Sequence, residues 1–134
     1  MTDLSEFLPL LASNIERNSA VLENRCSAQI LDWNEPSHLE SLPSDIDLVL
    51  ISDCVYYEDS LRPLVGVLEA LKAREILMSY EVRESEIKRQ IEKSFFELMK
   101  ASGFKSEDLT KLSHPDYLAV DELKIIKFKR EEMS

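Results

Sequence analysis

The chain has 134 residues, which is the size of one domain and too short for two. Its 16 basic and 26 acidic residues give a formal net charge of −10, which disfavours nucleic acid and anionic membranes as partners. Only 2 residues are glycine, so the 134 residues contain no glycine-rich phosphate-binding loop or dinucleotide fingerprint. With 44% hydrophobic and 31% charged residues, the composition is that of a globular domain rather than a disordered chain.

The first third of the chain predicts a helix followed by a short strand. Apolar residues recur three and four positions apart over 4–17, which places them on one stripe of a helix. The preceding pair Thr2–Asp3 can cap this helix. A short strand is predicted over 27–31, and Asp32 and Trp33 follow it directly.

Strands and helices alternate in the rest of the chain. The expected elements are a strand over 46–52, a helix over 59–72, a strand over 75–80, a helix over 85–102, and two antiparallel strands over 104–112 and 123–129 with a turn at 114–116. Gly103 is expected to end the helix over 85–102 in the left-handed conformation. The strand over 46–52 is a β-branched apolar run, which favours burial on both faces. This alternation predicts an α/β fold with an open sheet.

The sequence contains no metal-binding or membrane-spanning pattern. Cys26 and Cys54 lack the C-x-x-C spacing and a nearby histidine, so buried free thiols are expected rather than zinc ligands. The histidines His38 and His114 are expected in surface loops. An acidic start and short apolar runs argue against a secretory signal and a membrane span. We therefore expect a cytoplasmic, or also nuclear, monomer.

Acidic and aromatic residues follow several predicted strands. Ligands of open α/β sheets bind beyond the carboxyl ends of the strands. Asp32 and Trp33 follow one strand, Asp53 and Tyr56 follow the next, and Asp3 precedes the first helix. Each acid taken singly also fits an ordinary turn or helix cap. Taken together, the carboxylates and aromatic rings favour a site for a ligand with hydroxyl groups, a cation and a flat ring.

Four short motifs carry a resemblance to a known family. The run D-C-V-Y-Y at 53–57 resembles the D-C-x-Y-Y segment of the methyltransferase-like 21 group of seven-β-strand protein-lysine methyltransferases. The run Y-E-V-R at 80–83 is similar to the Y-E-x-R segment of the same group. The runs T-D-L at 2–4 and N-I-E-R-N at 14–18 are similar to its T-D-L and N-I-x-x-N segments. The resemblance extends over nearly the whole chain.

The resemblance implies a Rossmann-like fold that binds S-adenosylmethionine and transfers its methyl group to a protein lysine. Asp3 matches the acid that accepts hydrogen bonds from the ribose hydroxyls, and Asp32 and Trp33 match the segment that lines the adenine pocket. Asp53 and Tyr56 match the D-x-x-Y motif between cofactor and substrate lysine, so they are the expected catalytic residues, and Asp53 is also expected to contact the cofactor. The likeness is greatest to members that methylate valosin-containing protein, a hexameric ATPase, which is therefore the expected substrate.

One departure from the family concerns two strands and a glycine-rich turn that this sequence does not contain. Family members carry two strands and a glycine-rich turn before the T-D-L segment, and this chain begins after them. In the family's sheet order, 3-2-1-4-5-7-6, those strands lie between the strands that end at Asp32 and Asp53, which are expected to lack a neighbour. Residues 1–134 are thus expected to form the C-terminal part of one methyltransferase domain, an incomplete and truncated fold. A non-catalytic binding module and an acidic α/β adaptor for a protein partner remain alternatives.

Overall fold

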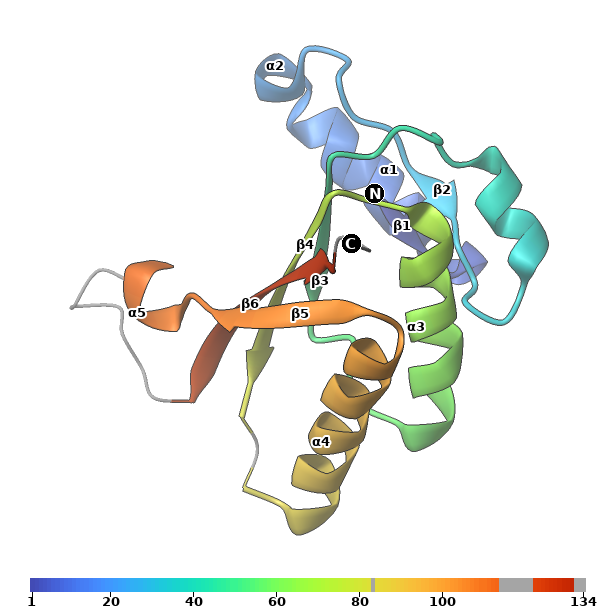
Figure 1. Ribbon diagram of the computed structural model, residues 1–134. Helices are drawn as coiled ribbons and strands as arrows, with labels where there is room; N and C mark the ends of the chain where they lie inside the picture. Colours follow the sequence, from blue (N-terminus) through green and yellow to red (C-terminus); the bar gives the residue numbers. More distant parts are fainter. Residues whose placement is uncertain (83, 114–121, 132–134) are drawn as a thin grey trace. The chain divides into compact units, whose positions relative to one another are not determined.

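The computed structural model describes residues 1–82, 84–113 and 122–131 (Figure 1). The chain divides into two compact units. The N-terminal unit comprises Met1–Leu42, and the C-terminal unit begins at Pro43. Among the described residues, no helix has both the length and the apolar character needed to span a membrane.

The N-terminal unit contains two short strands and several helical segments. The strands β1 (Thr2–Asp3) and β2 (Gln29–Ile30) pair in parallel. The N-terminal ammonium group extends this pairing, because it donates a hydrogen bond of 2.7 Å to the carbonyl of Ser27. The helical segments are η1 (Ser5–Phe7), α1 (Leu8–Arg17), α2 (Ser19–Leu22) and η2 (Pro36–Ser41).

In this unit the predicted helix cap and the missing strand neighbour are wrong, and the predicted helix is confirmed with a later α-helical start. The pair Thr2–Asp3 belongs to a strand rather than to a helix cap, and it supplies a neighbour that the strand before Asp32 was expected to lack. The helix predicted over 4–17 is α-helical only from Leu8. Pro9 explains this start, because proline lacks an N–H group and favours the first turn of a helix.

The C-terminal unit is built around a four-stranded sheet. Its elements are β3 (Leu48–Ser52), α3 (Glu58–Leu71), β4 (Glu75–Glu81), α4 (Glu86–Ala101), β5 (Phe104–Asp108), α5 (Thr110–Ser113) and β6 (Leu123–Arg130). The strand order is β3-β4-β6-β5, in which β3 and β4 are parallel and β6 is antiparallel to both of its neighbours. This order is the 4-5-7-6 part of the sheet that the resemblance implies, so that part of the prediction is confirmed.

The chain changes direction at Gly103 and at Asp108. Gly103 has φ of 82°, the left-handed conformation expected after the end of α4. The Asp108 carboxylate accepts hydrogen bonds from the N–H and the hydroxyl of Thr110, which begins α5. The strand predicted over 104–112 therefore ends at Asp108, because the aspartate bonds the backbone two residues later and forms a turn. The turn predicted at 114–116 lies outside the described residues, as does His114.

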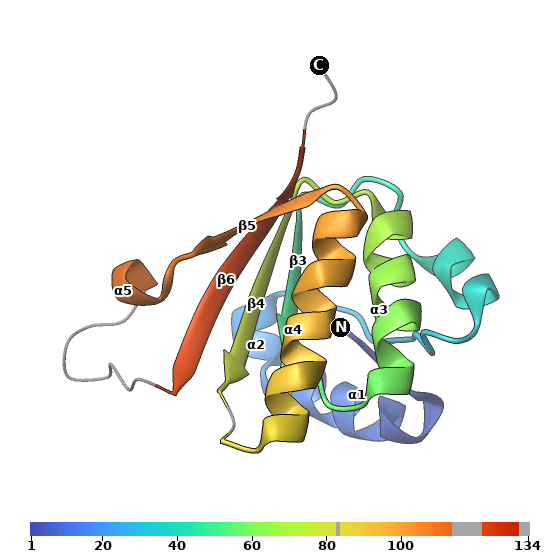
Figure 2. The same cartoon turned by 60° about the horizontal axis from the view of Figure 1, so that its bottom comes forward.

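The helices α3 and α4 lie side by side over one face of the sheet (Figure 2). On α4, the buried residues Ile91, Phe95 and Met99 are four positions apart, so they form one apolar stripe that faces inward. The Phe95 ring packs edge-on against Phe128, with ring centroids 6.0 Å apart. The largest fully buried side chains all belong to this unit: Phe95, Phe128, Leu61, Leu64, Leu68, Ile76, Met78 and Met99.

The strand β3 is covered on one face only within the described residues. Leu48 and Leu50 are 44% and 72% exposed, whereas Val49 and Ile51 are half-buried. The expected burial on both faces is therefore wrong for this structure, because α3 and α4 cover the same side of the sheet. Along its other edge, β3 has no strand partner among the described residues.

We predict that hydrogen exchange will be much slower in the C-terminal unit than in the N-terminal unit. Amide groups of β4 bond to strands on both sides and sit over the buried core, whereas β1 and β2 form a ladder of two residues each. Amides exchange slowly where opening requires loss of a packed core. Peptide-resolved exchange with mass spectrometric detection tests this prediction, and equal protection of β2 and β4 would contradict it.

Candidate functional site

The D-C-V-Y-Y loop, residues 53–57, begins at the carboxyl end of β3. Asp53 directly follows the strand, its side chain is exposed, and its φ is 51°. Its N–H donates a hydrogen bond of 3.1 Å to the carbonyl of Ser79 on β4. Aspartate is one of the few residues that adopt the left-handed conformation at modest cost. This residue therefore turns the chain out of the sheet and presents a carboxylate at the edge where ligands bind in α/β folds.

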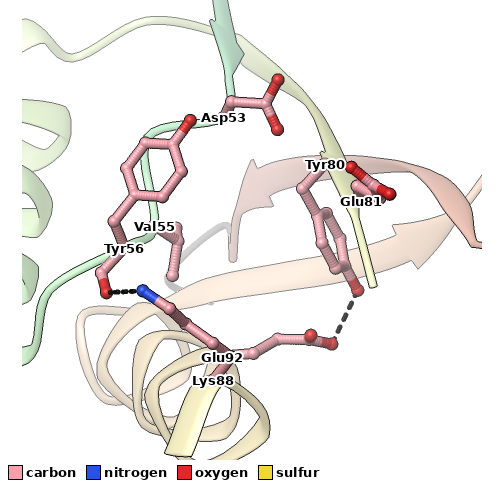
Figure 3. Close-up of a pocket in the computed structure, with 7 residues that line it drawn as sticks. All are labelled: Asp53, Val55, Tyr56, Tyr80, Glu81, Lys88 and Glu92. Carbon is pink, nitrogen blue, oxygen red and sulfur yellow. Dashed lines mark hydrogen bonds between the residues drawn. The ribbon is translucent and has the colours of Figure 1, made fainter. Parts of the chain in front are cut away.

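A small cavity lies between this loop, the end of β4 and the first turns of α4 (Figure 3). Its volume is about 20 Å³, enough for about one water molecule. Its walls hold three carboxylates, two phenol rings and one ammonium group. The lining residues are Asp53, Val55, Tyr56, Tyr80, Glu81, Lys88 and Glu92.

Lys88 joins α4 to the loop. Its Nζ atom donates a hydrogen bond of 2.8 Å to the carbonyl of Tyr56. The same atom lies 5.9 Å from the ring centroid of Tyr56 and 5.5 Å from that of Tyr57. Both distances are within the range of cation–π attraction. Lys88 makes no ion pair with a carboxylate in the described parts of the chain, so a carbonyl and two aromatic rings hold its charge.

Tyr80 and Glu92 form the opposite wall of the cavity (Figure 3). The Tyr80 hydroxyl donates a hydrogen bond of 2.9 Å to the Glu92 carboxylate. Burial raises the pKa of the Tyr80 phenol far above its ordinary value, and the hydrogen bond and negative charge of Glu92 raise it further. Tyr80 therefore stays protonated at neutral pH and acts here as a hydrogen-bond donor.

We predict that Tyr80→Phe will weaken the dependence of stability on alkaline pH. The fold favours the neutral phenol, so its stabilisation is complete below about pH 10, where an unfolded tyrosine begins to ionise, and is lost as the pH rises further. Urea unfolding between pH 8 and pH 11 should show a smaller loss for the variant than for the wild-type chain. Identical losses would contradict the assigned environment of Tyr80.

Three of the four residues expected to bind the cofactor, Asp3, Asp32 and Trp33, lie in the N-terminal unit, and Asp53 lies in the C-terminal unit. Because β1 and β2 are parallel, Asp3 at the end of one and Asp32 after the other lie at the same end of this strand pair. Asp3 accepts a hydrogen bond of 2.8 Å from the N–H of Leu4, and Asp32 accepts one of 2.9 Å from the N–H of Asn34. In each case the second carboxylate oxygen accepts no hydrogen bond from the described residues. Trp33, beside Asp32, is half-buried.

Sequence reasoning missed three neighbours of the expected site residues. His38, expected in a surface loop, is half-buried, and its Nδ1 atom accepts a hydrogen bond of 3.0 Å from the N–H of Asp32. Lys88 and Glu92 are one helical turn apart, so their common face on α4 was readable from the sequence. The contact of Lys88 with Tyr56 and that of Glu92 with Tyr80 were not readable, because no sequence pattern aligns a helix with a distant loop or strand.

Neither cysteine is placed as expected, and no metal centre is present among the described residues. Cys26 and Cys54 are half-buried rather than fully buried. The parts of the chain that the structure describes hold no group of three or more histidine, cysteine, aspartate or glutamate side chains able to bind a metal ion.

Comparison with known proteins identifies the family. Residues 1–102 match the family described as lysine methyltransferase. The chain belongs to this family. Protein-lysine N-methyltransferase EFM6 of Saccharomyces cerevisiae is 31% identical over 127 residues, which cover 85% of this chain and 49% of that protein. The chain therefore spans about half the length of this curated relative.

A solved structure supports the fold. The mitomycin 7-O-methyltransferase MmcR superposes with a TM-score of 0.64 at 14% sequence identity, over 97% of this chain and 41% of that chain. The expected α/β class, a partial Rossmann-like methyltransferase fold, is thus confirmed.

Proposed function

We propose that this chain forms the substrate-facing part of an S-adenosylmethionine-dependent protein-lysine N-methyltransferase. The observation that carries the proposal is the cavity beside residues 53–57, whose carbonyl and tyrosine rings already hold a lysine ammonium group, that of Lys88. The lysine methyltransferase family match supports the same reaction class. Asp53 and Tyr56 are the proposed catalytic residues, since both line this cavity.

The chain's own residues fit the nucleoside end of the cofactor. Asp3 and Asp32 each offer a carboxylate oxygen suited to ribose hydroxyls, and Trp33 offers a flat ring for adenine. The 2 glycines of the chain provide no turn for the methionine end. When bound, S-adenosylmethionine supplies an electrophilic methyl group on a cationic sulfonium.

The remaining steps concern the substrate amine. A lysine with an ordinary pKa of about 10.4 is protonated at neutral pH, and only its neutral form has the lone pair that attacks a methyl group. We propose that the Asp53 carboxylate orients this amine and that the Tyr56 ring packs against its charge. Both residues line the cavity, and the Lys88 ammonium group already lies 5.9 Å from the Tyr56 ring centroid. A nearby carboxylate also favours the ammonium form, so proton loss must precede or accompany attack.

Valosin-containing protein is the proposed substrate, on the resemblance of the D-C-V-Y-Y and Y-E-V-R motifs to the methyltransferase-like 21 group. We also propose a cytoplasmic, or additionally nuclear, monomer. The competing function is a module that binds the same partner without chemistry.

The test uses a chimeric enzyme, defined as this chain preceded by the two-strand, glycine-rich segment of a family member. Incubation with radiolabelled S-adenosylmethionine and purified valosin-containing protein should label one or more lysines, located by mass spectrometry. Label on other proteins but not on this ATPase would reject the proposed substrate alone. Partner binding without label on any protein would favour the non-catalytic module.

We predict that the 134-residue chain by itself binds S-adenosylmethionine weakly or undetectably. Its acids and Trp33 serve the nucleoside end only, and loss of part of a preorganised site sacrifices much of the binding free energy. Isothermal titration calorimetry measures this affinity directly. Micromolar binding by the chain would show that the methionine end has contacts other than a glycine-rich turn.

A further inference from the structure

The ammonium group of Lys88 is held by groups that suit any primary alkylammonium ion. Its Nζ atom is 2.8 Å from the Tyr56 carbonyl oxygen (Figure 3). It also lies 5.9 Å from the ring centroid of Tyr56 and 5.5 Å from that of Tyr57. A carbonyl acceptor and electron-rich ring faces are the common means of binding such cations. These partners recognise the ammonium group and not the backbone to which it is attached.

The charge around the cavity favours a cation. Three of the described lining residues, Asp53, Glu81 and Glu92, carry carboxylates, and Lys88 is the one cation among them. Negative lining charge raises the local concentration of cations from any source. Removal of the Lys88 ammonium would leave this preference in place and make it stronger.

The position beside the Tyr56 carbonyl holds one ammonium group at a time. The Lys88 Nζ atom occupies it at 2.8 Å from the carbonyl oxygen, and it would repel a second ammonium group placed there as a like charge. A substrate lysine therefore reaches the Tyr56 carbonyl only when Lys88 moves. Lys88 is half-buried in the first turn of α4, and its partners are neutral groups, so its departure leaves no unpaired buried charge.

We propose that Lys88 is an internal competitor that occupies the ammonium-binding position of the substrate lysine. The inference rests on the proposed function and adds regulation to that site. Lysine entry requires Lys88 to swing out, so affinity for a lysine-bearing protein is set partly by this intramolecular contact. A tethered group competes as if present at millimolar concentration or above.

The test compares two alanine variants of the 134-residue chain. Lys88→Ala vacates the position, and Lys93→Ala, an exposed residue on the same helix that pairs with Glu97, makes the same change in charge elsewhere. Each is titrated with butylammonium chloride and with 1-butanol, and backbone amide signals of residues 54–57 are followed by NMR. Lys88→Ala should bind butylammonium at least about 10-fold more tightly than the wild-type chain, since its tethered competitor is gone. Lys93→Ala should match the wild-type chain, and butanol should bind to neither variant.

Equal affinity of Lys88→Ala and the wild-type chain for butylammonium would overturn the inference and leave Lys88 as a clamp for the loop. Binding of butanol with the same affinity would also overturn it, because recognition would then be apolar. If Lys88→Ala does not fold, Lys88→Met with methylammonium replaces it, since methionine keeps the apolar stem and vacates only the ammonium position. The same two outcomes decide that experiment.

This experiment separates the inference from the proposed function, because alkylammonium binding requires neither cofactor nor methyl transfer. Enhanced binding by Lys88→Ala in a chimeric enzyme without activity would support the inference and reject the function. An active chimeric enzyme whose KM for the protein substrate is the same in Lys88→Ala and Lys93→Ala would support the function and reject the inference. The expected result is a lower KM in Lys88→Ala only.

Discussion

Asp53→Asn in the chimeric enzyme is expected to lower kcat by about 100-fold, the scale of one electrostatic contact made in the transition state. The side chain keeps its size and loses its charge. Asparagine also tolerates the left-handed backbone of this position, so the fold should be preserved. Single-turnover methyl transfer and thermal unfolding are measured on the same preparation. The free energy of unfolding should change by less than about 0.5 kcal/mol.

Asp47→Asn is the matched control for this experiment. Asp47 lies before the opposite end of β3, where its carboxylate makes an exposed ion pair of 3.4 Å with Arg74. The charge change is identical, but the site is remote from the cavity, so kcat should stay at the wild-type value. If Asp53→Asn keeps full turnover and instead loses about 1 kcal/mol of stability, Asp53 is a turn residue without a catalytic role.

Phe95→Ala is expected to lower the free energy of unfolding of the C-terminal unit by about 3–5 kcal/mol. The Phe95 ring has no exposed surface and contacts Phe96 and Phe128, so its removal leaves a cavity under α4. Domains of this size have a total stability of about 5–15 kcal/mol. Urea denaturation followed by far-ultraviolet circular dichroism should therefore show a largely destabilised variant.

Ile87→Ala tests whether the loss follows burial rather than helix position. Ile87 is on the same helix and is 71% exposed. Its truncation should change the unfolding free energy by less than about 0.5 kcal/mol. Similar losses for Ile87→Ala and Phe95→Ala would mean that α4 packs differently from the arrangement seen in Figure 2.

The sequence predicted the C-terminal unit well because its signals are local and strong. The apolar stripe of α4, the glycine at its end and the apolar run of β3 each identify a type of element, although the predicted burial of β3 on both faces was wrong. The strand predicted over 104–112 was too long, because the hydrogen bonds from Thr110 to Asp108 outweighed strand propensity. In the N-terminal unit, the pairing of Thr2–Asp3 with β2 joins residues far apart in sequence, and no local pattern encodes that register.

The candidate site was predicted only in part for a similar reason. Asp53 and Tyr56 are in one short motif, and the structure places both on the same cavity wall. Their catalytic roles remain predictions. Lys88 belongs to a helix more than thirty residues later, and its contact with the loop depends on the packing of α4 against the sheet. A lysine in the first turn of an amphipathic helix gives no signal of such a contact.

The edge of β3 that has no strand partner among the described residues limits how two copies of this chain can associate. An antiparallel pairing of two β3 strands centred on Leu50 would bring the exposed leucines together, which favours aggregation. The same register brings Asp47, which precedes β3, close to Asp53 of the other copy, which follows β3, and like charges across a strand pair are destabilising. Repulsion between these two acids therefore opposes the pairing of two β3 edges. Concentrated samples should stay dispersed in dilute neutral buffer and form β-rich assemblies in acid, where carboxylates lose their charge.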